Sequence, residues 1–218
     1  MNPRSVRRRR EQVLTAMLLV AGCDQQQYLG DPRAAADSGA PTDLGPVAVK
    51  RLFVTSSLYR STELGGLAGA DLRCQQVADS ATRAGLADLG GARWVAWLSD
   101  GSTDAIERLA DLGPWYLVDK QTRIFNNRAH VAIAPAMLRT GITQDERGNP
   151  IAITSANSLY WTGTAPGGRK APGHCDSWRD PMYSEGGLTG AIGEVGDRWT
   201  ARLSSACIGA HALLCFEQ

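Results

Sequence analysis

The cysteines are the feature that most limits how this chain can fold. The 218-residue sequence has five, an odd number that leaves one thiol without a partner inside the chain. Cys23 closes an N-terminal segment with the features of an export signal, and the other four are Cys74, Cys175, Cys207 and Cys215. Because exported proteins form disulfides readily, these four are expected to make two bridges, for which three pairings are possible.

The first 22 residues have the pattern of a secretory leader. Arg4 and residues 7–10 form a basic head, and residues 13–22 are apolar and uncharged, a run too short to span a bilayer as a helix. The leader ends in Leu-Val-Ala-Gly-Cys23, which resembles the lipobox where bacterial lipoproteins are cleaved and lipidated. We therefore predict a leader over residues 1–22 and a lipid on Cys23. The alternatives are an ordinary cleaved signal, a short buried helix, or twin-arginine export, whose apolar pair is missing.

Residues 24–49 are rich in Ala, Gly, Pro, Asp and Gln and show no periodicity, which predicts a disordered tether over residues 23–49. As a flexible coil it would span about 28 Å.

The charge of the expected mature chain is nearly balanced. Loss of five Arg and Glu11 with the leader leaves 18 basic against 21 acidic residues, a net charge of −3, and from Lys50 onward there are 17 of each sign. This balance argues against nucleic-acid binding and against attraction to anionic membranes, so the expected membrane contact is the lipid alone.

Residues 50–218 are expected to form one α+β domain with two helices, short strands and long loops. In the first helix, residues 69–85, Cys74 and Ala78 share an inward face with Val77 and Ala81, and Gly85 ends the helix. Asp104 and Glu107 fit a capping box for the second, which would bury Ile106, Leu109 and Ala110. No element is assigned within residues 123–150. The strand candidates are residues 51–55, 93–98, 115–118, 159–162, 199–203 and 211–216.

Several segments together resemble a known family. They are Gly-Leu-Ala-Gly-Ala-Asp-Leu-Arg-Cys74, Ala96-Trp-Leu-Ser99, Tyr160-Trp-Thr-Gly163, Gly168-Arg-Lys170, Cys175-Asp-Ser-Trp-Arg179, Ser205-Ala-Cys207 and Leu214-Cys-Phe-Glu217. In this order they resemble the endostatin domain that ends certain animal collagens, and similar domains occur in bacterial lipoproteins of unassigned role. The resemblance implies a C-type-lectin-like fold over residues 50–218, with nested bridges Cys74–Cys215 and Cys175–Cys207.

The chain departs from this family in its metal-binding residues. The animal domain binds zinc through histidines at its N-terminus, whereas His130, His174 and His211 all lie far from Lys50 in the sequence. The calcium-ligand triplets of C-type lectins do not occur either. We therefore expect no metal and no other cofactor.

The six tryptophans divide into two expected groups. Trp94 or Trp97, Trp161 and Trp199 are expected in the core, because small domains bury large aromatic rings. Trp115 and Trp178 are expected to be more exposed, and Trp178 is then a candidate for stacking on a sugar.

The basic residues after Gly168 are the main binding candidates. In the animal relatives, arginines on the matching loop bind heparan sulfate, which the resemblance carries to Arg169 and, less directly, to Lys170, Arg179 and Arg83. Guanidinium groups suit sulfate, phosphate and carboxylate oxygens. The alternative is that these charges are only solvated on a neutral domain.

Candidate catalytic groups are few. His174 and Cys175 are adjacent, so they are poorly placed to act as base and nucleophile, and Asp176 and Asp180 are an acid pair or simply part of a polar loop. We expect no catalytic residue and a lipid-anchored binding or structural module of the bacterial cell envelope, outside the cytoplasm. One alternative is an anionic-polysaccharide binder acting through Arg169 and Lys170, and another is a hydrolase of envelope polymers that uses Asp176 or Asp180.

Overall fold

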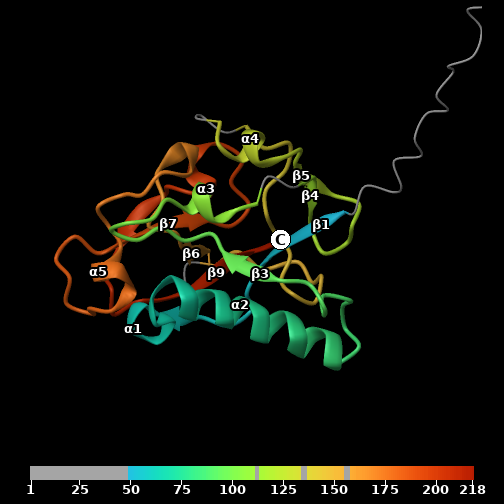
Figure 1. Cartoon of the computed structure of the whole chain (residues 1–218), viewed down its shortest axis with the longest axis horizontal. Coiled ribbons are helices and arrows are strands. Elements are labelled where there is room, and N and C mark those ends of the chain that lie inside the picture. Colours follow the sequence, from blue (N-terminus) through green and yellow to red (C-terminus); the bar gives the residue numbers. More distant parts are fainter. Residues whose placement is uncertain (1–48, 111–112, 134–136, 155–157) are drawn as a thin grey trace, which may run out of the picture. The chain divides into compact units, whose positions relative to one another are not determined.

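The strand β9 (Ala210–Glu217) is the centre of the fold (Figure 1). In the computed structural model, which describes residues 49–110, 113–133, 137–154 and 158–218, Ala212, Leu214 and Phe216 enter one hydrophobic cluster and Leu213 and Cys215 enter another. Side chains alternate across a strand, so the continuous apolar run of β9 fills cores on both faces of the sheet. The expected leader, Cys23 and tether up to residue 48 lie outside the described residues, and every described residue belongs to one compact unit.

Nine strands of the described chain form one mixed sheet. The order along its main path is β5-β4-β1-β9-β6-β7-β8, and β2 and β3 also pair with β9. β9 runs antiparallel to β1, β2 and β3 and parallel to β6. The strands other than β9 are β1 (Lys50–Val54), β2 (Tyr59–Arg60), β3 (Trp94–Ala96), β4 (Trp115–Tyr116), β5 (Arg123–Phe125), β6 (Leu159–Trp161), β7 (Gly187–Ala191) and β8 (Leu203–Ser205).

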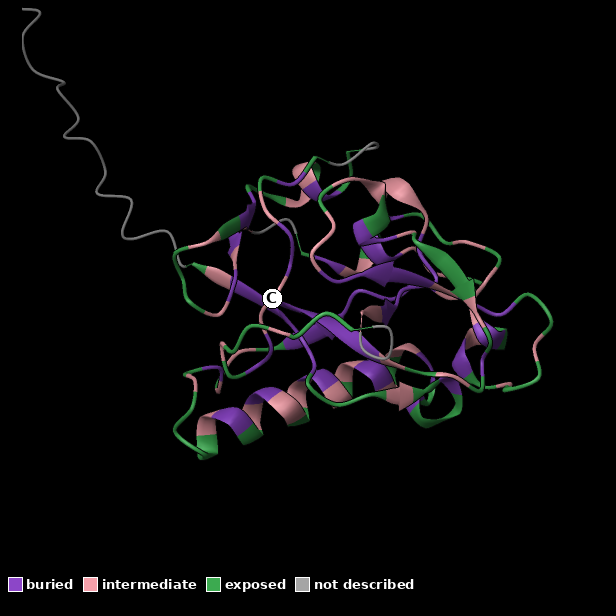
Figure 2. Cartoon of the chain, turned by 180° about the vertical axis from the view of Figure 1, so that it is seen from behind, coloured by how far each residue is buried: buried purple, intermediate pink, exposed green. Residues whose placement is uncertain are grey.

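The long helix α2 (Gly66–Arg83) covers one face of the sheet (Figure 1). Its buried residues are Gly66, Ala70, Cys74, Ala78 and Ala81, and Figure 2 shows this buried stripe turned toward the strands. These side chains are small, so the helix packs closely against β3 and β9. The helix predicted at 69–85 is thus confirmed, with a start three residues earlier than expected.

The remaining helical segments are single turns. They are α1 (Ser61–Leu64), α3 (Ala105–Arg108), α4 (Arg128–Val131), α5 (Cys175–Trp178) and the 3₁₀ turns η1 (Pro166–Gly168) and η2 (Asp197–Trp199). The second expected helix is therefore only one turn long. Residues 123–150, left without assignment, contain β5 and α4.

Two nested disulfides cross-link the domain, one between α2 and β9 and one between α5 and the turn before β9. Cys74 of α2 is bonded to Cys215 of β9, and Cys175 of α5 is bonded to Cys207, with sequence separations of 141 and 32 residues. The pairing implied by the resemblance is confirmed, as is the inward position of Cys74. The two bridges suggest an oxidising, extracytoplasmic environment.

Three local predictions were wrong. Residues 199–203 are not a strand, because Trp199 closes η2 and β8 begins only at Leu203. Asp104 precedes α3 but its carboxylate makes no capping hydrogen bond; instead the Ser99 hydroxyl accepts from Ala105 N at 2.8 Å. Ala110, expected on the buried side, is exposed, whereas Ile106 and Leu109 are buried.

Candidate functional site

The loop that carries Arg169 and Lys170 is a small rigid hairpin. Ala165 N donates to Arg169 O at 2.7 Å and Ala171 N donates to Gly163 O at 2.8 Å. Gly163 has a φ of 56°, and a Cβ at this position would lie 2.7 Å from Ser99 O. Only glycine combines this backbone conformation with such a close approach. The hairpin therefore has a fixed shape on the protein surface.

Buried hydroxyl groups anchor the base of this hairpin. The Thr164 hydroxyl donates to Thr162 O at 2.6 Å, so the Ser99 hydroxyl must donate in the 2.8 Å bond between Ser99 and Thr164. The Thr162 hydroxyl donates to Thr200 O at 2.7 Å, and the Thr200 hydroxyl donates to Thr164 O at 3.2 Å. All four residues are fully buried, and satisfied buried networks of this kind favour a single arrangement.

Asp104 fixes the basic end of the hairpin. Its carboxylate accepts from Lys170 N at 2.8 Å and from Arg169 Nη1 at 2.9 Å. These two hydrogen bonds hold the pKa of Asp104 below its usual value. The same contact raises the pKa of Arg169, whose side chain is still 69% exposed. The Asp104 carboxylate is occupied by these bonds to Arg169 and Lys170, which explains why it does not cap α3.

The four predicted basic residues do not converge on one surface. Arg169 and Lys170 share Asp104, and Lys170 Nζ also reaches Ser102 O at 3.4 Å. Arg179 lies at the start of α2, where a Cβ on Gly66 would be 3.7 Å from its Nη2. Arg83 lies at the other end of this helix and donates to Ser80 at 3.1 Å. Eighteen helical residues correspond to about 27 Å, so Arg179 and Arg83 cannot act at one site.

The expected exposure of Trp115 and Trp178 was wrong, since both are fully buried. Trp115 Nε1 donates to Glu217 O, and Trp178 Nε1 donates to Ser99 O, each at 2.8 Å. Each ring therefore has a polar partner inside the core, which removes the cost of burying its N–H. Trp178 is not available to stack on a sugar. The tryptophans expected in the core are buried as predicted.

The turn α5 before Arg179 is wound left-handed. Cys175, Asp176, Ser177 and Trp178 have φ angles of 49°, 47°, 54° and 65°. This conformation costs roughly 1–2 kcal/mol per non-glycine residue. The Cys175 bridge and the buried Trp178 hold the two ends of the turn.

The candidate catalytic residues around this turn have structural contacts. Cys175 is in a disulfide, and His174 Nδ1 accepts from Ser177 N at 2.9 Å, so these two do not form a nucleophile and base. Asp180 accepts from Met182 N at 2.8 Å. Asp176 is exposed on the strained turn.

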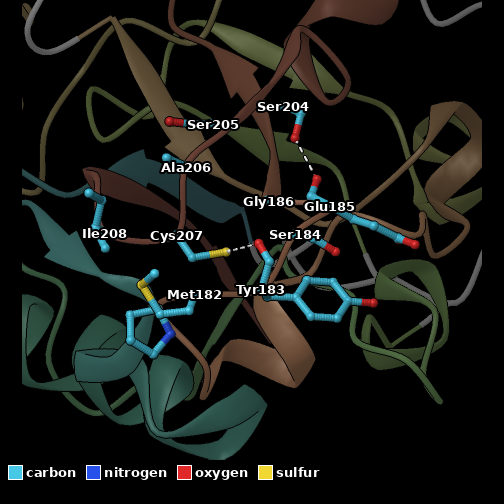
Figure 3. Close-up of a pocket in the computed structure, with 11 residues that line it drawn as sticks. Met182, Tyr183, Ser184, Glu185, Gly186, Ser204, Ser205, Ala206, Cys207 and Ile208 are labelled. Carbon is cyan, nitrogen blue, oxygen red and sulfur yellow. Dashed lines mark hydrogen bonds between the residues drawn. The ribbon is translucent and has the colours of Figure 1, made fainter.

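A cavity of about 330 Å³ lies beside the Cys175–Cys207 bridge, between residues 181–186 and 204–208 (Figure 3). In Figure 3 the side chains of Tyr183 and Glu185 point away from those of Met182 and Ile208. Sequence reasoning missed a contact at its edge, where Ser205 Oγ lies 2.7 Å from His211 Nε2. Burial lowers the pKa of His211, and its ring packs edge-on against Trp161 at 4.4 Å.

A second cavity, of about 500 Å³, is lined in part by Arg169. Arg128 of α4 and Glu107 of α3 contribute to its wall. Sequence reasoning missed Arg128 because it lies in the stretch without a clear pattern, and no local signal places it near Arg169.

The described residues contain neither a metal-binding cluster nor a membrane-spanning helix. Within residues 49–110, 113–133, 137–154 and 158–218, no group of three or more His, Cys, Asp or Glu side chains is arranged to hold a metal ion. No helix in the same residues has the length and apolar character to cross a membrane. In comparisons with other proteins, no family model matches the chain, and no curated protein has a similar sequence.

Proposed function

We propose that this protein is a lipid-anchored, non-catalytic binding module of the bacterial cell envelope, and that it binds an anionic polysaccharide through the basic hairpin. The observation that carries the proposal is the fixed shape of this hairpin, which presents the exposed Arg169 and Lys170 side chains on a rigid base. A binding loop that is ordered before it meets its ligand loses little conformational entropy on binding.

The proposed fold is the C-type-lectin-like fold of endostatin domains. Two features support it beyond the mixed sheet: the first and last strands of the domain, β1 and β9, pair antiparallel, and the two disulfides are nested in the implied order. The proposed lipid on Cys23 rests on the lipobox and on the pairing of the other four cysteines with one another. A domain outside the cytoplasm, attached by a lipid, has access to envelope polysaccharides.

The test is a titration of the purified full chain with heparin and with an isolated envelope polysaccharide. The double variant Arg169→Ala and Lys170→Ala should lose about tenfold or more in affinity, because each removes charge-assisted hydrogen bonds. Binding should also weaken as salt rises, since exposed charges are screened over about 8 Å at physiological ionic strength. Arg83→Ala is the matched control, an exposed arginine at the far end of α2, and should bind as the unaltered chain does. Equal binding by the double variant would contradict the proposal and leave a structural role.

The strained turn favours one competing function, hydrolysis of an envelope polymer by Asp176 or Asp180. Backbone strain often accompanies active sites, and Asp176 is exposed on the left-handed turn. Incubation of the same polysaccharide with the full chain distinguishes the two functions, because an enzyme releases new reducing ends and a binding module does not. Release that disappears in Asp176→Asn or Asp180→Asn would replace the binding proposal.

A further inference from the structure

The cavity beside Arg169 has walls from three segments far apart in the sequence. They are α3, α4 and the turn η1, and the lining residues are Ile106, Glu107, Arg128, Ala129, Ala132, Gly167 and Arg169. Figure 1 shows α3 and α4 on the side of the sheet opposite α2. At about 500 Å³ the space falls in the range of small-molecule sites.

Arg128 is held at this cavity by one of its three guanidinium nitrogens. Its Nε donates to Ile106 O at 2.9 Å, which ties α4 to α3. Among the described residues Nη1 and Nη2 of Arg128 have no hydrogen-bond partner, so these donors are available to a ligand. Arg169 is similar, because within the described part of the chain its guanidinium bonds through Nη1 alone, to Asp104. Two positioned guanidinium groups thus line the same cavity with free N–H groups.

The nearby acidic groups limit the charge of the ligand. Glu107 also lines the cavity, and Asp104 already pairs with Arg169. Two arginines with two carboxylates leave little net positive charge, so a group with two negative charges would be repelled by Glu107. A single carboxylate can accept from both arginines at a much smaller electrostatic cost.

The remaining surface of the cavity suits a sugar ring. Ile106, Ala129 and Ala132 offer apolar contact to ring C–H groups, and the Glu107 carboxylate can accept hydrogen bonds from hydroxyl groups. We infer that this cavity binds one uronic acid residue, with its carboxylate between Arg128 and Arg169 and its hydroxyl groups at Glu107. The inference rests on the proposed function in sharing Arg169, but it adds a specific acidic sugar unit and a residue, Arg128, on which general polyanion binding does not depend.

The test is an NMR titration of the full chain with methyl glucuronide, methyl galacturonide, methyl glucoside and glucose 6-phosphate. One of the uronides should bind with a dissociation constant on the order of 1 mM, as expected for so small a ligand, and should shift the signals of Ala129 and Ala132. The neutral glucoside should not bind, and the phosphate should bind at least several-fold more weakly than the uronide.

Variants then locate the site. Arg128→Met and Arg169→Met should each weaken uronide binding about tenfold, whereas the control Arg83→Met should not change it. Glu107→Gln should weaken uronide binding and strengthen phosphate binding, because it removes both the acceptor charge and the repulsion. The melting temperature of Arg128→Met checks that loss of binding is not loss of folding.

The outcomes separate the inference from the proposed function. Absence of uronide binding, or equal uronide affinity in Arg128→Met, overturns the inference even if heparin still binds through Arg169 and Lys170. Preferred binding of glucose 6-phosphate overturns it as well, because the site would then be a phosphate site. Uronide binding that depends on Arg128 supports it, even if heparin binding does not depend on Lys170.

Discussion

At the scale of single residues, the left-handed turn makes a prediction about Asp176. Its φ of 47° costs roughly 1–2 kcal/mol for a residue with a Cβ. Asp176→Gly removes this cost. However, glycine has more conformational freedom in the unfolded chain, which destabilises the folded state by about 0.5–1 kcal/mol. The variant should therefore be more stable by about 0.5–1 kcal/mol in chemical denaturation. Asp176→Ala keeps the Cβ and is the control, which should show no gain.

His211 makes a second prediction at this scale, about pH. Burial lowers its pKa below the ordinary value of 6.5, so the unfolded chain binds a proton more readily than the folded one. The contribution of His211 to stability is thus complete above pH 6.5 and declines as the pH falls toward its folded pKa. Thermal unfolding between pH 7 and pH 5 should show a smaller fall in melting temperature for His211→Gln than for the unaltered chain. Parallel declines would show that other groups cause the pH dependence.

At the scale of elements, a buried ion pair joins the two central strands. Arg51 of β1 bonds to the Glu217 carboxylate of β9 through its backbone N at 2.8 Å, Nε at 2.7 Å and Nη2 at 3.0 Å, and both side chains are buried. Arg51→Met leaves a buried carboxylate without its partner and should lower the free energy of unfolding by about 3–5 kcal/mol.

The double variant Arg51→Met and Glu217→Leu tests the reason for that loss. It removes both charges together, so it should be much closer to the unaltered chain in urea denaturation than Arg51→Met alone. A double variant as unstable as the single one would show that packing of the Arg51 stem, and not its charge, accounts for the effect.

Elements with a clear periodicity were predictable from the sequence, and those defined by tertiary contacts were not. The stripe of Cys74, Ala78 and Ala81 predicted α2, and the apolar run at residues 211–216 predicted the strand β9. In contrast, the Asp104 carboxylate has the spacing of a helix cap but bonds to a loop 65 residues away. Residues 199–203 have strand composition, yet Trp199 closes a 3₁₀ turn.

The candidate site was predictable only in part. Arg169 and Lys170 were identified through the resemblance, but Arg128 meets them only through the packing of α4 on α3. Trp178 was expected to be more exposed, but it is buried. Its partner, Ser99 O, lies 79 residues away, and no local pattern reveals such a bond.

At the scale of the whole molecule, we predict that Cys23 carries a lipid that anchors the protein to a membrane. Because the other four cysteines pair with one another, Cys23 is the thiol left for a lipid. Cys23→Ala should abolish incorporation of radiolabelled palmitate and leave the protein unprocessed or released from the membrane. Labelling of the variant at the level of the unaltered chain would contradict the assignment, and Cys23→Ser provides a second, more conservative variant.

The position of β9 limits when the domain can fold. Strands β1, β2 and β3 all pair with β9, so segments made early have no central strand until residues 210–217 have followed them. The sheet is therefore completed only when this C-terminal strand is present, and the larger covalent loop closes only when Cys215 meets Cys74. Under the proposed export, the chain would cross the membrane unfolded and its four domain cysteines would be oxidised afterwards.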